Sequence, residues 1–182
     1  MNTFQQDLDN AIAYHGHLCA GQILGVRMAR AALAHLNSIE PESSPDLVVF
    51  VECDRCLADA IGIVTGCKIG RRTLKWMDYG KSAATFVNTK TKTACRVVLN
   101  KHFFAPEGAD LLVYFASIPD AELLTINMVE VHLNPEDMPG KPLMAVTCQK
   151  CGEEVTDKRH VEVDGTILCK SCAYGGYYRN AT

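Results

Sequence analysis

Helical periodicity dominates the first third of the chain. Residues 4–14 place Phe4, Leu8 and Ile12 on one face, which predicts a short amphipathic helix. From about 22 to 36 apolar residues and alanines resume, which predicts a second, largely buried helix. Two glycines interrupt the segment between them, so we expect the two helices to meet at an elbow over residues 15–21.

Alternation and β-branched residues take over after residue 45. A strand is predicted over 46–53, a helix over 57–65, and strands over 72–79, 82–89, 93–100 and 125–133. Residues 109–116 form an apolar run that fits either a helix or a strand. Asp120 is placed to cap a helical turn reaching Leu124. These elements predict an α+β fold with helices packed on a mostly antiparallel sheet.

The segment 134–142 contains three prolines and a glycine in nine residues, which disfavours regular structure and predicts an extended connector. We therefore expect a core domain over 1–134, a linker over 135–142 and a small C-terminal domain over 143–182.

The bulk composition narrows the functional class only a little. Of 182 residues, 48% are hydrophobic and the formal net charge is −3, values typical of a globular domain. No apolar run approaches the roughly 18 residues that span a membrane. The acidic, polar start does not resemble a secretory signal, and nine cysteines, an odd number, argue against a complete disulfide framework. A cytoplasmic location is expected.

Four cysteines near the C-terminus form two C-x-x-C pairs separated by 17 residues: Cys148, Cys151, Cys169 and Cys172. This spacing is typical of a structural zinc site, because each pair can present two thiolates from a tight turn and Zn²⁺ prefers a closed tetrahedral set. The alternatives are disulfides or unrelated thiols. We predict a zinc finger that fills the C-terminal domain.

The elbow supplies a second candidate site, with His15, His17 and Cys19 in five residues. In a continuous helix His15 and Cys19 would share a face, whereas a bend at the glycines would let all three converge. A helix junction with an incidental histidine pair is the structural alternative. Cys56, after the first strand, is the next candidate ligand, and His15 is an alternative to His17.

Positive charge is concentrated between Gly66 and Lys101, where nine basic residues accompany one acid. Lysines on a solvated strand face explain part of this pattern. Lys68 and Arg71 follow Cys67 directly, so we predict that they attract an anion near the thiols. Cys95 lies in mid-strand and is expected to serve packing alone.

Several short motifs together resemble the FmdE family of formylmethanofuran dehydrogenase subunits. The motifs are the elbow His15–Gly21 with Gly25 and Arg27, Glu52–Cys56 with Asp59 and Ala60, Thr65–Cys67 with Gly70, and Asp78–Lys81. The resemblance covers roughly the first 130 residues. It implies an α+β core that forms an intertwined homodimer, a Cys/His metal cluster and, in some members, a C-terminal treble-clef zinc finger.

Three functions remain open. The family resemblance favours a metal-binding accessory protein, associated with a molybdenum or tungsten oxidoreductase, whose core holds a transition metal or handles an oxyanion. The second alternative is an enzyme that uses Cys19 or Cys56 as a nucleophile, or a catalytic metal. The third is a zinc-finger regulator that contacts protein or nucleic acid. Residues 148–182 carry five basic and five acidic side chains, so nucleic-acid binding is not favoured.

Overall fold

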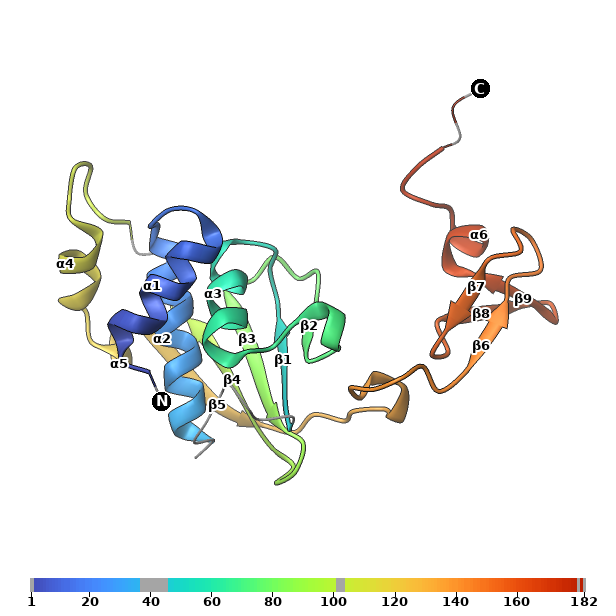
Figure 1. Cartoon of the computed structure of the whole chain (residues 1–182), viewed down its shortest axis with the longest axis horizontal. Helices are drawn as coiled ribbons and strands as arrows, with labels where there is room; N and C mark the ends of the chain where they lie inside the picture. The colour runs from blue at the N-terminus through green and yellow to red at the C-terminus, as the bar shows by residue number, and fades with distance from the viewer. Residues whose placement is uncertain (1, 37–45, 101–103, 180, 182) are drawn as a thin grey trace. The chain divides into compact units, whose positions relative to one another are not determined.

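The computed structural model describes residues 2–36, 46–100, 104–179 and 181, which fall into two compact units, Met1–His132 and Leu133–Thr182 (Figure 1). Within the described ranges, no helix combines the length and the apolar character that crossing a membrane requires.

Three helices begin the N-terminal unit. They are α1 (Phe4–His15), α2 (Ala20–His35) and α3 (Cys56–Thr65), in agreement with the three expected from periodicity. A capping box starts α1: Gln6 N donates to Thr3 Oγ1 at 3.2 Å, and Thr3 N donates to Gln6 Oε1 at 2.8 Å. The helix ends at Gly16, whose φ of 94° is left-handed and therefore favours glycine.

Five strands form one sheet in the order β2-β1-β3-β4-β5, and only the β1–β2 pair is parallel. The strands are β1 (Leu47–Val51), β2 (Leu74–Trp76), β3 (Ala83–Asn88), β4 (Thr93–Leu99) and β5 (Leu124–Val129). The predicted mostly antiparallel sheet is confirmed. β2 is shorter than the predicted 72–79, because a 3-10 turn, η2 (Ile69–Arg71), and a left-handed Arg72 precede it.

Two short helices settle the segments that periodicity left open. The apolar run becomes α4 (Leu111–Ala116), which begins where Asp110 accepts hydrogen bonds from the amides of Leu112 and Val113. The expectation that Asp120 caps the next helix is wrong. Pro119 occupies the cap position of α5 (Asp120–Leu123), and the Asp120 carboxylate instead accepts from Arg27 Nε at 2.7 Å.

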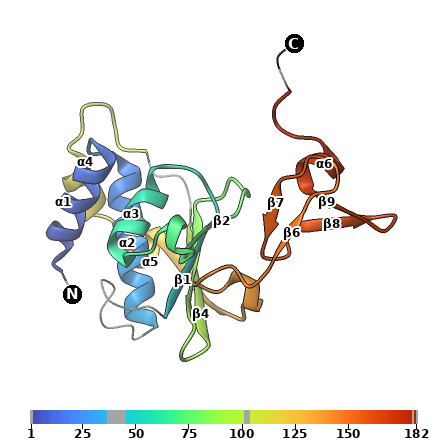
Figure 2. The ribbon, with the colours of Figure 1, turned by 45° about the vertical axis from the view of Figure 1, so that its right-hand side comes forward.

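The core lies between the helices and one face of the sheet, an arrangement that can be followed in Figure 2. Alternate strand residues such as Val49, Phe86 and Val97 are buried there against helical residues such as Leu57 and Ile61. Cys95 belongs to the same cluster and is fully buried, so it has the packing role expected of it.

Helices α2 and α3 approach closely at two glycines one helical turn apart, Gly21 and Gly25. A Cβ at Gly25 would lie 2.6 Å from the Leu57 carbonyl oxygen and 2.7 Å from the Ala60 Cβ. At Gly21 it would lie 2.7 Å from the Cys56 Cβ. The absence of side chains at these positions therefore sets the distance between the two helices.

The C-terminal unit consists of two hairpins and a short helix. Its elements are β6 (Ala145–Thr147), β7 (Glu154–Thr156), β8 (His160–Val163), β9 (Thr166–Cys169) and α6 (Lys170–Tyr174). The expected extended connector contains a 3-10 turn, η3 (Pro135–Asp137), because proline suits the first position of a helical turn. Arg159 donates to Asp137 at 2.9 Å, so this turn is held to the zinc-finger unit.

Substitution Gly25→Ala should destabilise the N-terminal unit by about 1–3 kcal/mol, because the overlap with Leu57 and Ala60 outweighs the better helix propensity of alanine. Urea denaturation measures the change. Gly70→Ala is the matched control, since a Cβ there meets nothing within 4 Å. Equal stabilities for the two variants would contradict the close approach.

The pH dependence of stability should report an ion pair between β1 and β4. Arg96 donates to both oxygens of the buried Glu52 carboxylate, at 2.6 and 2.7 Å, and this hydrogen bonding lowers the Glu52 pKa below 4.5. The stabilisation is therefore present above pH 4.5 and lost as the pH falls through the folded-state pKa.

Glu52→Gln should remove about 1 kcal/mol near neutral pH and progressively less below pH 4.5. Chemical denaturation across the acid range measures both effects. The exposed Glu107→Gln is the control and should match wild type throughout. A deficit for Glu52→Gln that does not shrink in acid would refute the role of ionisation.

Candidate metal centres

The elbow between α1 and α2 brings its two histidines and its cysteine together. α1 ends at His15, Gly16 turns the chain, and Cys19 occupies the extended cap position of α2. The donor atoms of His15, His17 and Cys19 all lie within 4.8 Å of one another. Of the two geometries the sequence allowed, the structure has the convergent one.

His15 is oriented by a carboxylate on α3. Its Nδ1 lies 2.8 Å from Asp59 Oδ2, and its Nε2 is buried without a hydrogen-bond partner among the described residues. A carboxylate that accepts from Nδ1–H fixes the tautomer in which Nε2 carries a lone pair. This arrangement is common for metal-ligating histidines, and a metal ion would satisfy the otherwise unpaired Nε2.

Cys56 begins α3 beside the elbow. Burial and the neighbouring Cys19 side chain raise the pKa of its thiol, in that order. The fully buried Gln22 donates to the Cys56 carbonyl at 2.7 Å, and its own Oε1 is a second buried atom without a described partner. Cys56 lies outside the set of donors that converges within 4.8 Å, so it is placed as a neighbour of the cluster rather than as a member.

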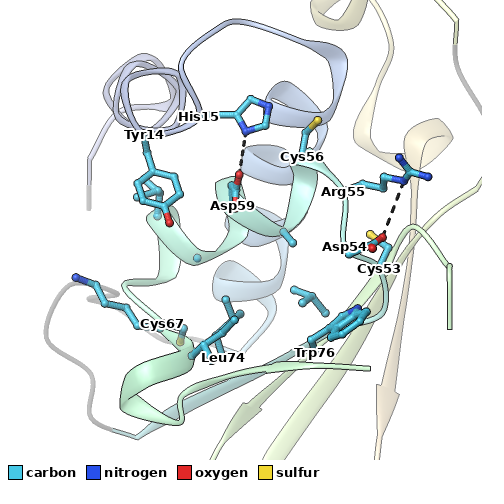
Figure 3. Close-up of a pocket in the computed structure, with 16 residues that line it drawn as sticks. Tyr14, His15, Cys53, Asp54, Arg55, Cys56, Asp59, Cys67, Leu74 and Trp76 are labelled. Atoms are coloured by element: carbon cyan, nitrogen blue, oxygen red, sulfur yellow. Dashed lines mark hydrogen bonds and ion pairs between the residues drawn. The ribbon is translucent and has the colours of Figure 1, made fainter. Parts of the chain in front are cut away.

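A cavity of about 730 Å³ opens on the other side of His15. As Figure 3 shows, its walls come from the end of α1, the end of β1, α3 and β2, with Tyr14, Cys53 and Trp76 among the lining residues. Cys67 and Lys68 lie here as well. Arg71 does not line the cavity and is exposed, and Lys101, the last basic residue of the predicted anion-attracting stretch, lies outside the described residues.

Cys67 is a buried, neutral thiol. Its Sγ lies 3.6 Å from the Leu47 carbonyl oxygen, and burial raises its pKa. Burial likewise raises the pKa of Cys53. Both thiols therefore act as small apolar wall groups near neutral pH.

Asp59 is a candidate functional residue for which the sequence alone predicted no role. The signal was present, because Asp59 follows Cys56 by three residues on a predicted helix and so shares its face. The aromatic residues Tyr14 and Trp76 carried no comparable signal, since their meeting at one cavity depends on the tertiary fold.

The four C-terminal cysteines converge as expected, with all four sulfurs within 4.8 Å of one another. Cys148 and Cys151 lie on a tight turn after β6, in which Gly152 N donates to the Cys148 carbonyl at 2.9 Å. Cys169 caps α6 and Cys172 lies within it. The sulfurs of Cys151 and Cys169 are 3.9 Å apart.

The electrostatics of this cluster call for a cation. Backbone N–H groups of Cys151 and Cys169 lower the pKa of Cys148 to about 6. The neighbouring sulfurs, Cys169 first, raise the pKa of Cys172 to about 12. Mutual repulsion therefore prevents four thiolates from forming alone, whereas a divalent ion such as Zn²⁺ stabilises them together.

Comparisons with known proteins agree with this division. Residues 14–120 match the family described as "FmdE, Molybdenum formylmethanofuran dehydrogenase operon", as the sequence motifs suggested. Residues 145–174 match the "Prokaryotic dksA/traR C4-type zinc finger", a range that contains all four C-terminal cysteines. The C-terminal unit is therefore a four-cysteine zinc finger.

Two individual proteins are similar over most of the chain. One, from Archaeoglobus fulgidus, is 31% identical over 193 residues and is named "Probable S-adenosyl-L-methionine-binding protein". The match covers 91% of this chain and 51% of that protein, so the chain spans about half of its relative's length. The other is the crystal structure of a tungsten formylmethanofuran dehydrogenase FmdE-like protein from Syntrophus aciditrophicus. It has a TM-score of 0.60 and 22% identity, with coverage of 98% and 96%, and it supports the fold.

Replacing Cys148 and Cys169 together with serine should release one zinc ion per chain and unfold the C-terminal unit, because small zinc domains draw most of their folding energy from the metal. Elemental analysis measures the metal, and limited proteolysis after Pro142 measures the unfolding. Cys95→Ala, which removes a thiol far from any cluster, should keep the full zinc content. Unchanged zinc in the double variant would contradict the assignment.

Proposed function

The chain belongs to the FmdE family, and we propose that it is a metal-binding accessory protein with a second metal site in its core. The proposed ligands are Cys19 and His17 with His15, and Cys56 is the reserve ligand beside them. The observation that carries the proposal is the buried, unpaired Nε2 of His15, directed by Asp59.

The donor set determines what this site could do. Imidazole and thiolate together suit zinc, copper or iron-group metals, and the affinity order alone does not choose among them. Three convergent donors leave a fourth position of a tetrahedral ion open, in contrast to the four-cysteine finger. We therefore infer a weaker, exchangeable core site that can accept an outside ligand.

An accessory role is favoured over a cysteine nucleophile. A nucleophilic thiol needs a lowered pKa, but burial raises the pKa values of Cys53, Cys56 and Cys67. A metal-based enzyme would use the same open position, so the metal site is the feature that both functions share. A zinc-finger regulator of nucleic acid remains disfavoured by the balanced charge of residues 148–182.

The zinc finger, the partner and the location complete the proposal. We infer a treble-clef arrangement for the finger, in which a cysteine turn precedes a hairpin and a helix that carries the second cysteine pair. A metalloenzyme of the molybdenum or tungsten class is the proposed partner, with an oxyanion as the proposed cargo. Nine free cysteines favour the reducing cytoplasm.

Cobalt should reveal the core site spectroscopically. With one equivalent of Zn²⁺ occupying the tighter finger, added Co²⁺ should give a thiolate-to-metal absorption band that Cys19→Ser abolishes and Cys95→Ala retains. Asp59→Asn should keep the band but weaken Co²⁺ affinity by about 10–100-fold, because His15 loses its orienting partner.

The matched control for Asp59→Asn is Asp54→Asn, which alters an exposed carboxylate nearby with no contact to His15. It should bind Co²⁺ like wild type. A band that survives in Cys19→Ser, or no band in the wild-type protein, would leave the elbow as a simple helix junction.

Homodimerisation is proposed from the family resemblance. Light scattering on a shortened chain ending at Asn134 should give twice the mass of the monomer at micromolar concentration. A domain of this size has enough residues to bury a core alone, so a monomer is a realistic result. That result would reject the proposed core dimer.

A further inference from the structure

We propose that the cavity between α3 and β2 binds a small organic anion with a flat, apolar body, oriented with one end toward His15. The orientation toward His15 rests on the proposed core metal site, whereas binding in the cavity does not. No metal is needed for the cavity itself.

The size and walls of the cavity define the body of the ligand. A volume of about 730 Å³ lies within the range of about 300–1,000 Å³ that small-molecule sites occupy. The floor is apolar, formed by side chains such as Val51, Ile63 and Leu74. Tyr14 and Trp76 also line the cavity, yet 67% and 51% of their surfaces are exposed. Exposed aromatic faces beside an apolar floor suit a flat ring system.

The charged groups of the cavity define the sign of the ligand. Asp59 is engaged by His15, and Asp54 lies 4.0 Å from Arg55. Lys68 is exposed, and it has no carboxylate within ion-pair distance in the part of the chain that the structure describes. The available charge at the cavity is therefore positive, which favours a carboxylate, sulfonate or phosphate group near Lys68.

The position of His15 links the cavity to the metal site. Its ring lines the cavity and also belongs to the convergent donors of the elbow. Figure 3 shows His15 above Asp59 at one end of the cavity, while Cys67, next to Lys68 in the chain, lies at another. A ligand whose anionic group lies at Lys68 can thus extend toward the open position of the proposed metal.

A fluorescent naphthalene pair tests the two features separately. Anilinonaphthalene sulfonate has a flat body and an anionic group, whereas N-phenylnaphthylamine has the same body without charge. Trp76 is the only tryptophan of the chain and lines the cavity, so energy transfer from it reports binding there. Full-length, zinc-loaded protein should bind one sulfonate probe per chain, saturably, with quenching of Trp76.

Lys68→Gln should weaken the sulfonate probe by about fivefold and leave the neutral probe within error, since one exposed charge contact is lost. Arg71→Gln removes the same charge three residues away, outside the cavity, and should bind both probes like wild type. Ala58→Leu, which narrows the cavity from its α3 wall, should weaken both probes.

Several outcomes would overturn the proposal. Equal effects of Lys68→Gln and Arg71→Gln would show that only general charge matters, and unchanged binding in Ala58→Leu would place the probes elsewhere. Binding that declines as protein concentration rises would show that a second copy of the chain covers the cavity. Repeating the titration with Co²⁺ in the core distinguishes the two proposals, because probe binding without any cobalt band rejects the core metal and leaves the cavity intact.

Discussion

The close approach of α2 to α3 is the contact on which the candidate sites of the N-terminal unit depend. Gly21 and Gly25 lie one turn apart on α2, and a Cβ at either position would come within 2.7 Å of α3 atoms. Because Gly21 faces Cys56, the start of α3 lies beside the elbow that carries Cys19. The same approach places Asp59, one turn further along α3, against His15. A wider spacing would separate the cysteines and leave His15 without its orienting carboxylate.

The His15–Asp59 hydrogen bond then gives one side chain two environments. Nδ1 is satisfied by the carboxylate, and Nε2 is left buried without a described partner. An unpaired buried acceptor costs free energy, roughly 1–3 kcal/mol, so the fold does not gain stability from this arrangement as it stands. A cation at Nε2 would recover that cost. The histidine is therefore better explained by binding than by packing, which is the reverse of the conclusion for Cys95.

Periodicity predicted most of the architecture because the helices α1 to α3 and the strands β1, β3 and β4 each bury one regular face or run. It failed where local geometry overrides the pattern. β2 is shortened by a left-handed Arg72, and the proline-rich segment contains a 3-10 turn held by Arg159. Asp120 has the residue type of a helix cap, but Arg27 from another helix takes its carboxylate.

The candidate sites divide in the same way. The zinc finger could be predicted in full, because two C-x-x-C pairs bring their own turn geometry and need little from the rest of the chain. The elbow ligands could be named but not assembled, since their convergence depends on a left-handed Gly16. The cavity could not be predicted, because Tyr14, Lys68 and Trp76 are neighbours only through the parallel β1–β2 crossover.

The two metal sites consequently differ in what the loss of metal would do. The finger has short hairpins and few buried apolar side chains of its own, so its fold and its ion are coupled. The elbow is attached to a core that is already packed by three helices and a five-stranded sheet. An ion could enter or leave that site without unfolding the protein around it. A closed site on a metal-dependent module and an open site on a metal-independent scaffold suit, respectively, a structural ion and one that is exchanged.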